Sequence, residues 1–216
     1  MFCTVNGIRL YYEVCGVGRP MLLVHGNGES HDIFDRSLPE LAQSHRVYAV
    51  DSRCHGQSTR TKELSYDRMA DDYMGFIRAM ELEKPVFYGF SDGGIIGLLI
   101  AIRAPELLGR LIVSGANLNP GGLKTASRLS MVPRAAAGDR LYRMMLRQPH
   151  ITPEELGQIT VPTVVLAGEH DVIRPAHTAL IARSIPNSTL KILPGEDHGS
   201  YIVHSGELAR ILHQYL

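Results

Sequence analysis

The feature that most constrains the fold of this chain is residues 86–99, where a short apolar run leads through a glycine-flanked serine into a second apolar run. Residues 89–93 read Gly-Phe-Ser-Asp-Gly, with Ser91 at the centre. In a turn this tight, the backbone two residues before the serine meets the backbone two residues after it, so both positions need glycine. Such a turn presents a hydroxyl at the edge of a sheet, facing the free N–H groups of a helix N-terminus. The pattern therefore predicts a nucleophilic serine at position 91.

The pentapeptide alone is weak evidence for a nucleophilic serine, because Gly-x-Ser-x-Gly often arises by chance in a chain of this composition. The neighbouring residues strengthen it. The residues before it, 86–88, are apolar and typical of a strand. Those after it, 95–102, are apolar on most sides, as expected of a helix packed against a sheet. The context favours a strand, a sharp turn and a buried helix.

The composition is that of an ordinary globular chain. At 216 residues and 44% hydrophobic content it can bury one sizeable core, so we expect a single domain over residues 1–216. Lys and Arg together number 22, as do Asp and Glu, which leaves no net charge to attract nucleic acid or a membrane surface. We therefore expect a small-molecule partner, with no nucleic acid and no membrane involved. The oligomeric state is left open.

The three cysteines, Cys3, Cys15 and Cys54, are odd in number and widely spaced. This spacing argues against both a disulfide framework and a metal site. No basic segment followed by an apolar run opens the sequence, and no apolar stretch is long enough to span a bilayer. These features predict a cytoplasmic protein without a cofactor or metal.

Strand-like and helix-like patterns alternate along most of the chain. Asn6-Gly7 between two short apolar segments predicts an antiparallel hairpin. Alternation of strands with helices beyond it predicts an α/β fold, a mostly parallel sheet of about eight strands covered by helices on both faces. The expected strands are residues 3–5, 8–14, 21–25, 46–50, 86–90, 111–114, 163–167 and 189–193. The expected helices include residues 66–80, 176–184 and 207–215.

Residues 117–159 break this alternation, because they contain no strand pattern. We expect a short helical lid inserted over the top of the sheet. Leu141, Met144 and Met145 fall at helical spacing and form one apolar stripe, which either seals the lid onto the sheet or lines a substrate pocket. The basic residues of the segment favour a solvated face, with binding of an anionic substrate as the alternative. They are Lys124, Arg128, Arg134, Arg140, Arg143 and Arg147.

A serine hydroxyl becomes a good nucleophile when a histidine takes its proton and an acid orients that histidine. Asp171 follows the expected strand 163–167, and His198 follows the expected strand 189–193. Loops after parallel strands lie at the carboxyl edge of the sheet, on the same side as Ser91. Asp197 is the alternative acid, although adjacent residues rarely face each other. His170 and His177 are weak candidates for metal ligands, because no carboxylate or cysteine completes a recognisable metal-site spacing with them.

The chain resembles the α/β-hydrolase superfamily over nearly its whole length. The matching segments are residues 25–28 (His-Gly-Asn-Gly), residues 51–58, the Ser91 turn and the Asp171 and His198 loops. The resemblance implies a triad of Ser91, Asp171 and His198, with an oxyanion hole made by the backbone N–H groups of Asn27 and Asp92. We expect His25 to brace the loop that carries Asn27 through hydrogen bonds, with direct contact to the substrate as the alternative.

Two departures from the superfamily pattern bear on the site. Cys54 stands where a glycine is usual, which affects the conformation of that loop, and we interpret its thiol as structural. Asp92 brings a carboxylate next to the oxyanion hole, where it opposes the developing charge unless it points away and is stabilised by the helix N-terminus.

These features predict a carboxylesterase-like serine hydrolase that cleaves small carboxylic esters or lactones through an acyl-enzyme. Dehalogenase and epoxide hydrolase chemistry are disfavoured, because those branches need an aspartate where Ser91 stands. Thioesterase, C–C hydrolase, peptidase and hydroxynitrile lyase activities remain open. A non-catalytic ligand-binding or interaction protein on the same fold is the alternative from a different class.

Overall fold

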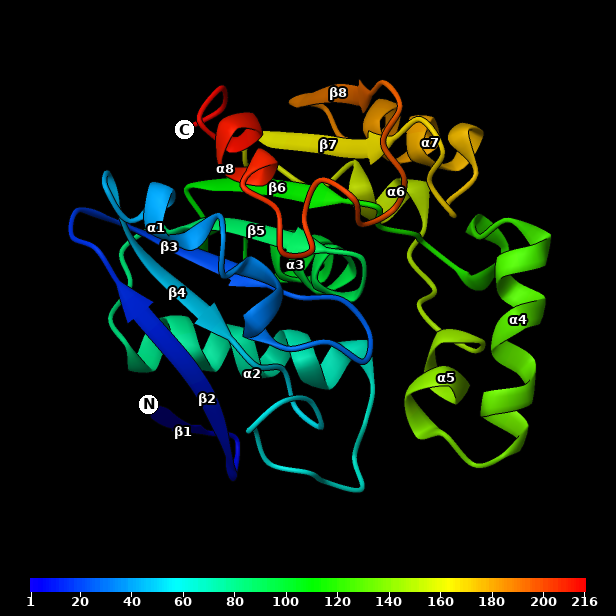
Figure 1. Ribbon diagram of the computed structural model, residues 1–216, viewed down its shortest axis with the longest axis horizontal. Helices are drawn as coiled ribbons and strands as arrows, with labels where there is room; N and C mark the ends of the chain where they lie inside the picture. The colour runs from blue at the N-terminus through cyan, green and yellow to red at the C-terminus, as the bar shows by residue number, and fades with distance from the viewer.

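The computed structural model describes residues 1–216 and contains one eight-stranded sheet (Figure 1). The strand order is β1-β2-β4-β3-β5-β6-β7-β8. The β1–β2 and β2–β4 pairs are antiparallel, and all the other pairs are parallel. The strands are β1 (Phe2–Val5), β2 (Ile8–Cys15), β3 (Arg19–Val24), β4 (His45–Val50), β5 (Val86–Phe90), β6 (Arg110–Ser114), β7 (Thr163–Gly168) and β8 (Ser188–Leu193). The predicted fold class, a mostly parallel sheet of about eight strands, is confirmed.

The hairpin at the start of the chain forms as the sequence predicts. Asn6 and Gly7 both have positive φ, 48° and 75°, which is the conformation of the tight turn that joins two antiparallel strands. Val5 pairs with Ile8 across this turn. The hairpin continues the sheet beyond β4 and leaves the parallel strands at its centre.

The central strands are buried on both faces, which explains their unbroken apolar runs. In β3, Leu22 and Val24 pack into one hydrophobic cluster, while Met21 and Leu23 pack into the cluster on the opposite face. Helices cover both faces. The first face carries α2 (Tyr66–Ala79), α3 (Asp92–Arg103), α6 (Pro153–Leu156) and α7 (Pro175–Ser184). The opposite face carries the 3₁₀ helix η1 (His31–Phe34), α1 (Leu38–Leu41) and α8 (Glu207–Leu212).

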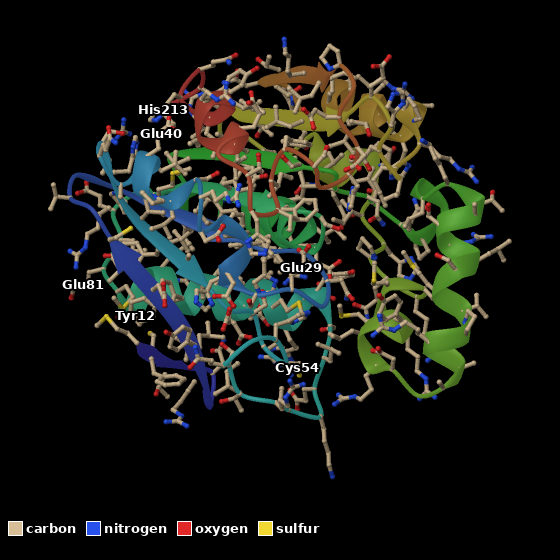
Figure 2. The ribbon with its side chains drawn as sticks, viewed as in Figure 1. Tyr12, Glu29, Glu40, Cys54, Glu81 and His213 are labelled. Carbon is tan, nitrogen blue, oxygen red and sulfur yellow. The ribbon has the colours of Figure 1, made fainter.

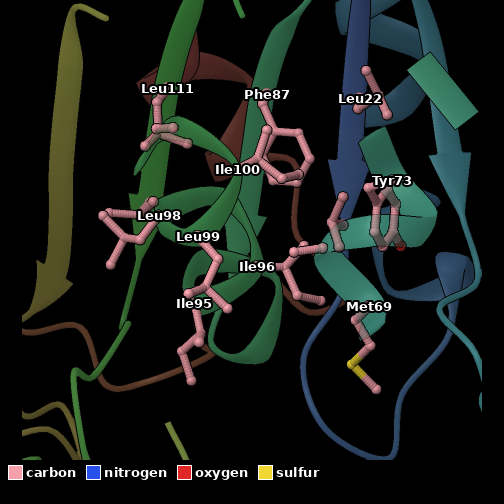
Figure 3. Close-up of a cluster of buried hydrophobic side chains, with 14 of the residues drawn as sticks. Leu22, Met69, Tyr73, Phe87, Ile95, Ile96, Leu98, Leu99, Ile100 and Leu111 are labelled. Atoms are coloured by element: carbon pink, nitrogen blue, oxygen red, sulfur yellow. The ribbon is translucent and has the colours of Figure 1, made fainter. Parts of the chain in front are cut away.

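Helix α3 follows β5 directly, and its burial fixes where its N-terminus points. Ile95 to Ala101 are all buried, and Figure 3 shows their apolar side chains against β5, β6 and α2. Gly97 faces the sheet so closely that a Cβ there would lie 2.7 Å from Leu111 and 2.9 Å from Phe87. The helix is therefore held tightly on the strands that precede and follow it.

The segment between β6 and β7 is helical, and no strand forms in it. It contains the 3₁₀ helix η3 (Pro120–Gly122), α4 (Thr125–Ala136), α5 (Arg140–Met145) and α6. Helices α4 and α5 pack on each other and stand away from the sheet at the right of Figure 1. Helix α6 instead packs against α3 and α7, and Leu156 is fully buried there. Of the predicted lid segment, residues 117–159, α4 and α5 stand off the sheet and α6 packs onto its covering helices.

No helix combines the length and the apolar character that crossing a bilayer requires.

Replacement of Ile96 by Ala tests how much the burial of α3 contributes to stability. Ile96 is fully buried, so we expect Ile96→Ala to lower the free energy of unfolding by about 2–5 kcal/mol in urea titrations. Leu129→Ala is the matched control, because Leu129 is 59% exposed on α4 and should change stability by less than about 0.5 kcal/mol. Equal losses in the two variants would contradict the packing described here.

Candidate active site

Ser91 lies in the sharp turn between β5 and α3, with φ 52° and ψ −111°. A residue other than glycine is strained at positive φ, and the close packing around the turn holds Ser91 there. A Cβ on Gly89 would lie 2.1 Å from the Gly93 carbonyl oxygen, and a Cβ on Gly93 would lie 2.2 Å from the Val24 carbonyl oxygen. Both positions therefore need glycine, as the sequence predicts.

The structure brings Ser91, His198 and Asp171 together. Ser91 Oγ lies 3.1 Å from His198 Nε2, and His198 Nδ1 lies 2.7 Å from Asp171 Oδ1. Asp171 is buried, and the same oxygen accepts the Ile173 N–H at 2.8 Å. Because a carboxylate only accepts, Nδ1 carries the imidazole proton and Nε2 is left to accept from the serine hydroxyl.

The histidine ring fits because the residue beyond β6 is a glycine. Gly115 has φ 62°, and a Cβ there would lie 2.6 Å from His198 Cε1. On another side, the ring of His198 packs against Phe90 with the ring centroids 4.9 Å apart. The sequence did not single out Gly115. Its position directly after a buried strand, at the carboxyl edge of the sheet, could have marked it as a site residue.

Asp197, the alternative acid, faces its own loop. Its Oδ1 accepts the N–H groups of Gly199 at 2.9 Å and Ser200 at 2.8 Å. These two bonds lower the pKa of the Asp197 carboxyl below its usual value. The carboxyl group in contact with His198 is therefore that of Asp171. His177, considered as a metal ligand, accepts the Leu118 N–H through Nε2.

The backbone N–H groups of Asn27 and Asp92 make no hydrogen bond within the protein. His25 fixes the direction of the first. Its Nε2 accepts the Ser52 N–H at 3.0 Å, so Nδ1 carries the proton and donates to the Gly26 carbonyl at 2.7 Å. The carbonyl and N–H of one peptide group point in opposite directions, so the Asn27 N–H faces away from His25.

Burial lowers the pKa of His25 to about 3, and the nearby His55 ring acts in the same direction. The imidazole therefore stays neutral, and its Nε2 remains an acceptor for Ser52. This arrangement supports the expectation that His25 braces the loop.

The Asp92 carboxylate is held by two side chains. It accepts the Tyr66 hydroxyl at 2.7 Å and the side-chain amide of Asn27 at 3.1 Å. Burial raises the pKa of this carboxyl, while both hydrogen bonds oppose the rise. The two residues with free N–H groups are thus joined through their own side chains. Nothing in the sequence singles out Tyr66, at the start of α2, for this contact.

Asp51, at the start of the loop after β4, holds both that loop and the segment that follows β3. Asp51 is buried and accepts the N–H groups of His31 and Gln57, both at 2.8 Å. Cys54, labelled in Figure 2, adopts φ 65°, the left-handed conformation for which glycine is the usual residue. Its sulfur lies 3.4 Å from both the N and the O of Thr61. The cysteine therefore keeps the glycine-like turn and holds the next segment of the loop.

A cavity of about 310 Å³ opens beside Ser91 and His198. Its apolar wall is built from the Ser91 turn, the insertion and the Asp171 loop, by Phe90, Leu123, Met131, Met145, Val172 and Ile173. Its polar residues are Asn27, Glu29, Asn117, Ser127, Ser130 and Tyr142.

The structure places the three residues of the predicted pocket stripe in different surroundings. Met145 lines the cavity, but Met144 is buried in the main hydrophobic cluster and Leu141 is not part of the wall. Successive helical residues point about 100° apart, so Met144 and Met145 face different surroundings. The cavity instead includes Met131 of α4.

Glu29 is a lining residue that the sequence analysis missed. It follows Gly26 in the same loop, and its Oε2 accepts the Gly26 N–H at 2.9 Å. Burial raises the pKa of the Glu29 carboxyl above its usual value. In Figure 2 it lies near the centre of the view, on the side of the sheet that faces α4 and α5. The position of this acidic residue in a loop at the carboxyl edge of the sheet could have marked Glu29 as a candidate from the sequence.

Comparison with known proteins identifies the family of this chain. The family described as alpha/beta hydrolase fold matches residues 19–141, more than half of the chain. The 2-hydroxymuconate semialdehyde hydrolase of Pseudomonas sp. (strain CF600) is 36% identical over 115 residues, 51% of this chain and 41% of the relative. The chain spans less than half the length of the first curated relatives it matches.

Other matches extend over almost the whole chain. The pimeloyl-[acyl-carrier protein] methyl ester esterase of Aliivibrio salmonicida is 24% identical, covering 96% of this chain and 95% of the relative. That alignment runs over 254 positions, more than the 216 residues of this chain, so the relative carries residues that this chain lacks. The esterase RhEst1 from Rhodococcus sp. ECU1013 has a TM-score of 0.86 at 21% identity, covering 99% of this chain and 96% of that one, and shows the same fold.

The neutral state of His25 predicts a pH-dependent contribution to stability. Between pH 6.5 and about 3 the unfolded chain binds a proton at His25 that the folded protein does not, so this contribution is present above pH 6.5 and lost as the pH falls. We expect the stability difference between the wild type and His25→Gln to shrink as the pH is lowered from about 7 to about 4. Chemical denaturation at several pH values measures it, and a constant difference would contradict the assignment.

Proposed function

The chain belongs to the α/β-hydrolase fold family, and we propose that within it this protein is a serine hydrolase that cleaves small carboxylic esters or lactones. One observation carries the proposal. The hydrogen-bonded series from Ser91 to His198 to Asp171 opens onto a cavity beside two N–H groups without partners. A nucleophile, its base and an anion-stabilising site are the parts that acyl transfer requires.

In the first step, Ser91 Oγ attacks the carbonyl carbon of the ester and His198 Nε2 takes the hydroxyl proton. Asp171 holds the Nδ1–H of the imidazole and stabilises its protonated form. The negative oxygen of the tetrahedral intermediate accepts hydrogen bonds from the N–H groups of Asn27 and Asp92. In comparable sites one such donor contributes about 3–4 kcal/mol to the transition state.

In the second step, His198 returns its proton to the leaving alkoxide as the C–O bond breaks, which leaves the acyl group on Ser91. Water then attacks this acyl-enzyme with His198 as the base, and the carboxylic acid departs as the Ser91 hydroxyl is restored. A lactone follows the same steps, except that its leaving alkoxide stays attached to the acyl group.

The shape of the cavity supports small substrates. Its volume of about 310 Å³ is at the lower end of the range for small-molecule sites. Esterase is also the activity in the names of a full-length relative and of a structural neighbour. The name of another relative describes a semialdehyde hydrolase. The proposal of an ester substrate therefore rests on the cavity and on the hydrogen-bonded residues Ser91, His198 and Asp171.

Loss of either partner in the Ser91–His198 pair should abolish turnover. We expect Ser91→Ala and His198→Ala each to lower kcat for a p-nitrophenyl ester by about 10⁴-fold or more, and the double variant to be little worse. The two residues act as one unit, so their losses do not multiply. Steady-state kinetics with the folded variants, checked by circular dichroism, gives the comparison. Losses that multiply, or a Ser91→Ala variant with normal turnover, would argue against a shared role.

The two neighbouring methionines of α5 offer a matched pair of variants. Met145 lines the cavity, so Met145→Ala should raise KM for a butyrate ester by up to about tenfold, or about 1.4 kcal/mol of lost apolar contact, with little effect on acetate esters. Met144 lies in the core, so Met144→Ala should instead lower stability by about 2–5 kcal/mol and leave KM unchanged. The reverse outcome would place Met144 at the acyl group.

A further inference from the structure

The cavity beside Ser91 contains one carboxylate that the proposed reaction does not use. Glu29 lines it, and its side chain makes one hydrogen bond, to the Gly26 N–H. Glu29 is half-buried and takes part in no ion pair, whereas the buried carboxylates of Asp51, Asp92 and Asp171 each accept from two or more groups. A carboxylate removed from water gains strongly from a cation or a charged donor placed beside it.

The protein places no permanent cation there, and the one imidazole that lines the cavity, His198, is hydrogen-bonded to Asp171 and Ser91. The lining residues include no Lys or Arg, and none of the six basic residues of the insertion is among them. Arg140 donates to the backbone of Thr61 and Lys62, and Arg143 donates to the Ala135 carbonyl. The one carboxylate and the absence of Lys and Arg in the cavity wall therefore favour a cationic or neutral substrate over an anionic one.

Glu29 lies close to the nucleophile. A Cβ placed on Gly26 would lie 2.7 Å from Glu29 Oε2 and 3.1 Å from Ser91 Cβ, so the carboxylate and the serine side chain are neighbours across this glycine. A substrate whose carbonyl carbon sits at Ser91 thus brings the first atoms of its acyl group within reach of Glu29.

We propose that this site prefers esters whose acyl part carries a protonated primary amine next to the scissile carbonyl, and that Glu29 binds the ammonium group. The inference rests on the proposed function, because it places the ester carbonyl at Ser91. An ammonium donating to a carboxylate in a partly buried site is a charge-assisted hydrogen bond, one of the stronger polar contacts that a protein makes.

The competing explanation is that Glu29 only holds the oxyanion loop through Gly26. The variant Glu29→Gln separates the two roles, because its amide oxygen can still accept the Gly26 N–H while the charge is lost. A loop role affects every ester alike. An ammonium subsite affects only those esters that carry the amine.

The test compares L-alanine benzyl ester with benzyl isobutyrate, in which a methyl group replaces the ammonium. The ratio of their kcat/KM values is measured for the wild type, for Glu29→Gln and for a control, Glu154→Gln, at a pH where the amine is protonated. Glu154 is an exposed carboxylate outside the cavity. The result is the change in this ratio from the wild type to each variant. The amino ester is intrinsically more reactive, but this difference is the same for every protein and cancels in the comparison.

We expect Glu29→Gln to lower the ratio of the alanine ester over the isobutyrate ester by about tenfold or more and Glu154→Gln to leave it unchanged. An unchanged ratio in Glu29→Gln, or equal losses on both esters, would overturn the inference and leave the proposed hydrolase intact.

A binding measurement keeps the inference testable without turnover. Calorimetric titration with L-alaninamide and isobutyramide should show a preference for the amine that Glu29→Gln removes. If neither ester is hydrolysed, the proposed function fails, yet this preference still supports the ammonium subsite. The absence of any preference in the wild type would refute it.

Discussion

The close approach of three backbone segments at Ser91 is the constraint on which the site depends. The end of β5, the start of α3 and the end of β3 come so near that Gly89 and Gly93 have no room for a side chain. The Gly93 N–H also donates to the His25 carbonyl at 3.2 Å, which ties the turn to the oxyanion loop. Apolar burial of α3 supplies the force that holds this contact, and the strained backbone of Ser91 follows from it.

Buried polar contacts then set the finer geometry. His25 orients the Gly26–Asn27 peptide, and Asp92 joins the side chain of Asn27 to Tyr66 on α2. The His25 ring, the Asp92 carboxylate and the Tyr66 hydroxyl each have a hydrogen-bonding partner in place of water, which makes their burial tolerable. Ser91, Asp171 and His198 thus lie on loops at one edge of the sheet, and in the proposed reaction the N–H groups of Asn27 and Asp92 are directed before substrate binds.

The sequence predicted what depends on local pattern. The alternation of strand-like and helix-like segments predicted the ends of the strands to within one or two residues. Asn6-Gly7 predicted the hairpin, and the spacing of Gly89 and Gly93 predicted the turn at Ser91. Contacts set by tertiary packing were beyond it. Met144 and Met145 look alike in sequence, but only the rotation of a short helix decides which one meets the cavity. Glu29, Tyr66 and Gly115 act through neighbours far away in the chain or through a bend in a loop, neither of which periodicity encodes.

The central claim is that acyl transfer passes through Ser91, and rapid-quench mass spectrometry during turnover of p-nitrophenyl butyrate tests it most directly. We expect a butyryl group on the peptide that contains Ser91, formed together with a burst of p-nitrophenol and then lost as the enzyme turns over. Turnover without any acylated peptide, or acylation at another residue, would contradict it.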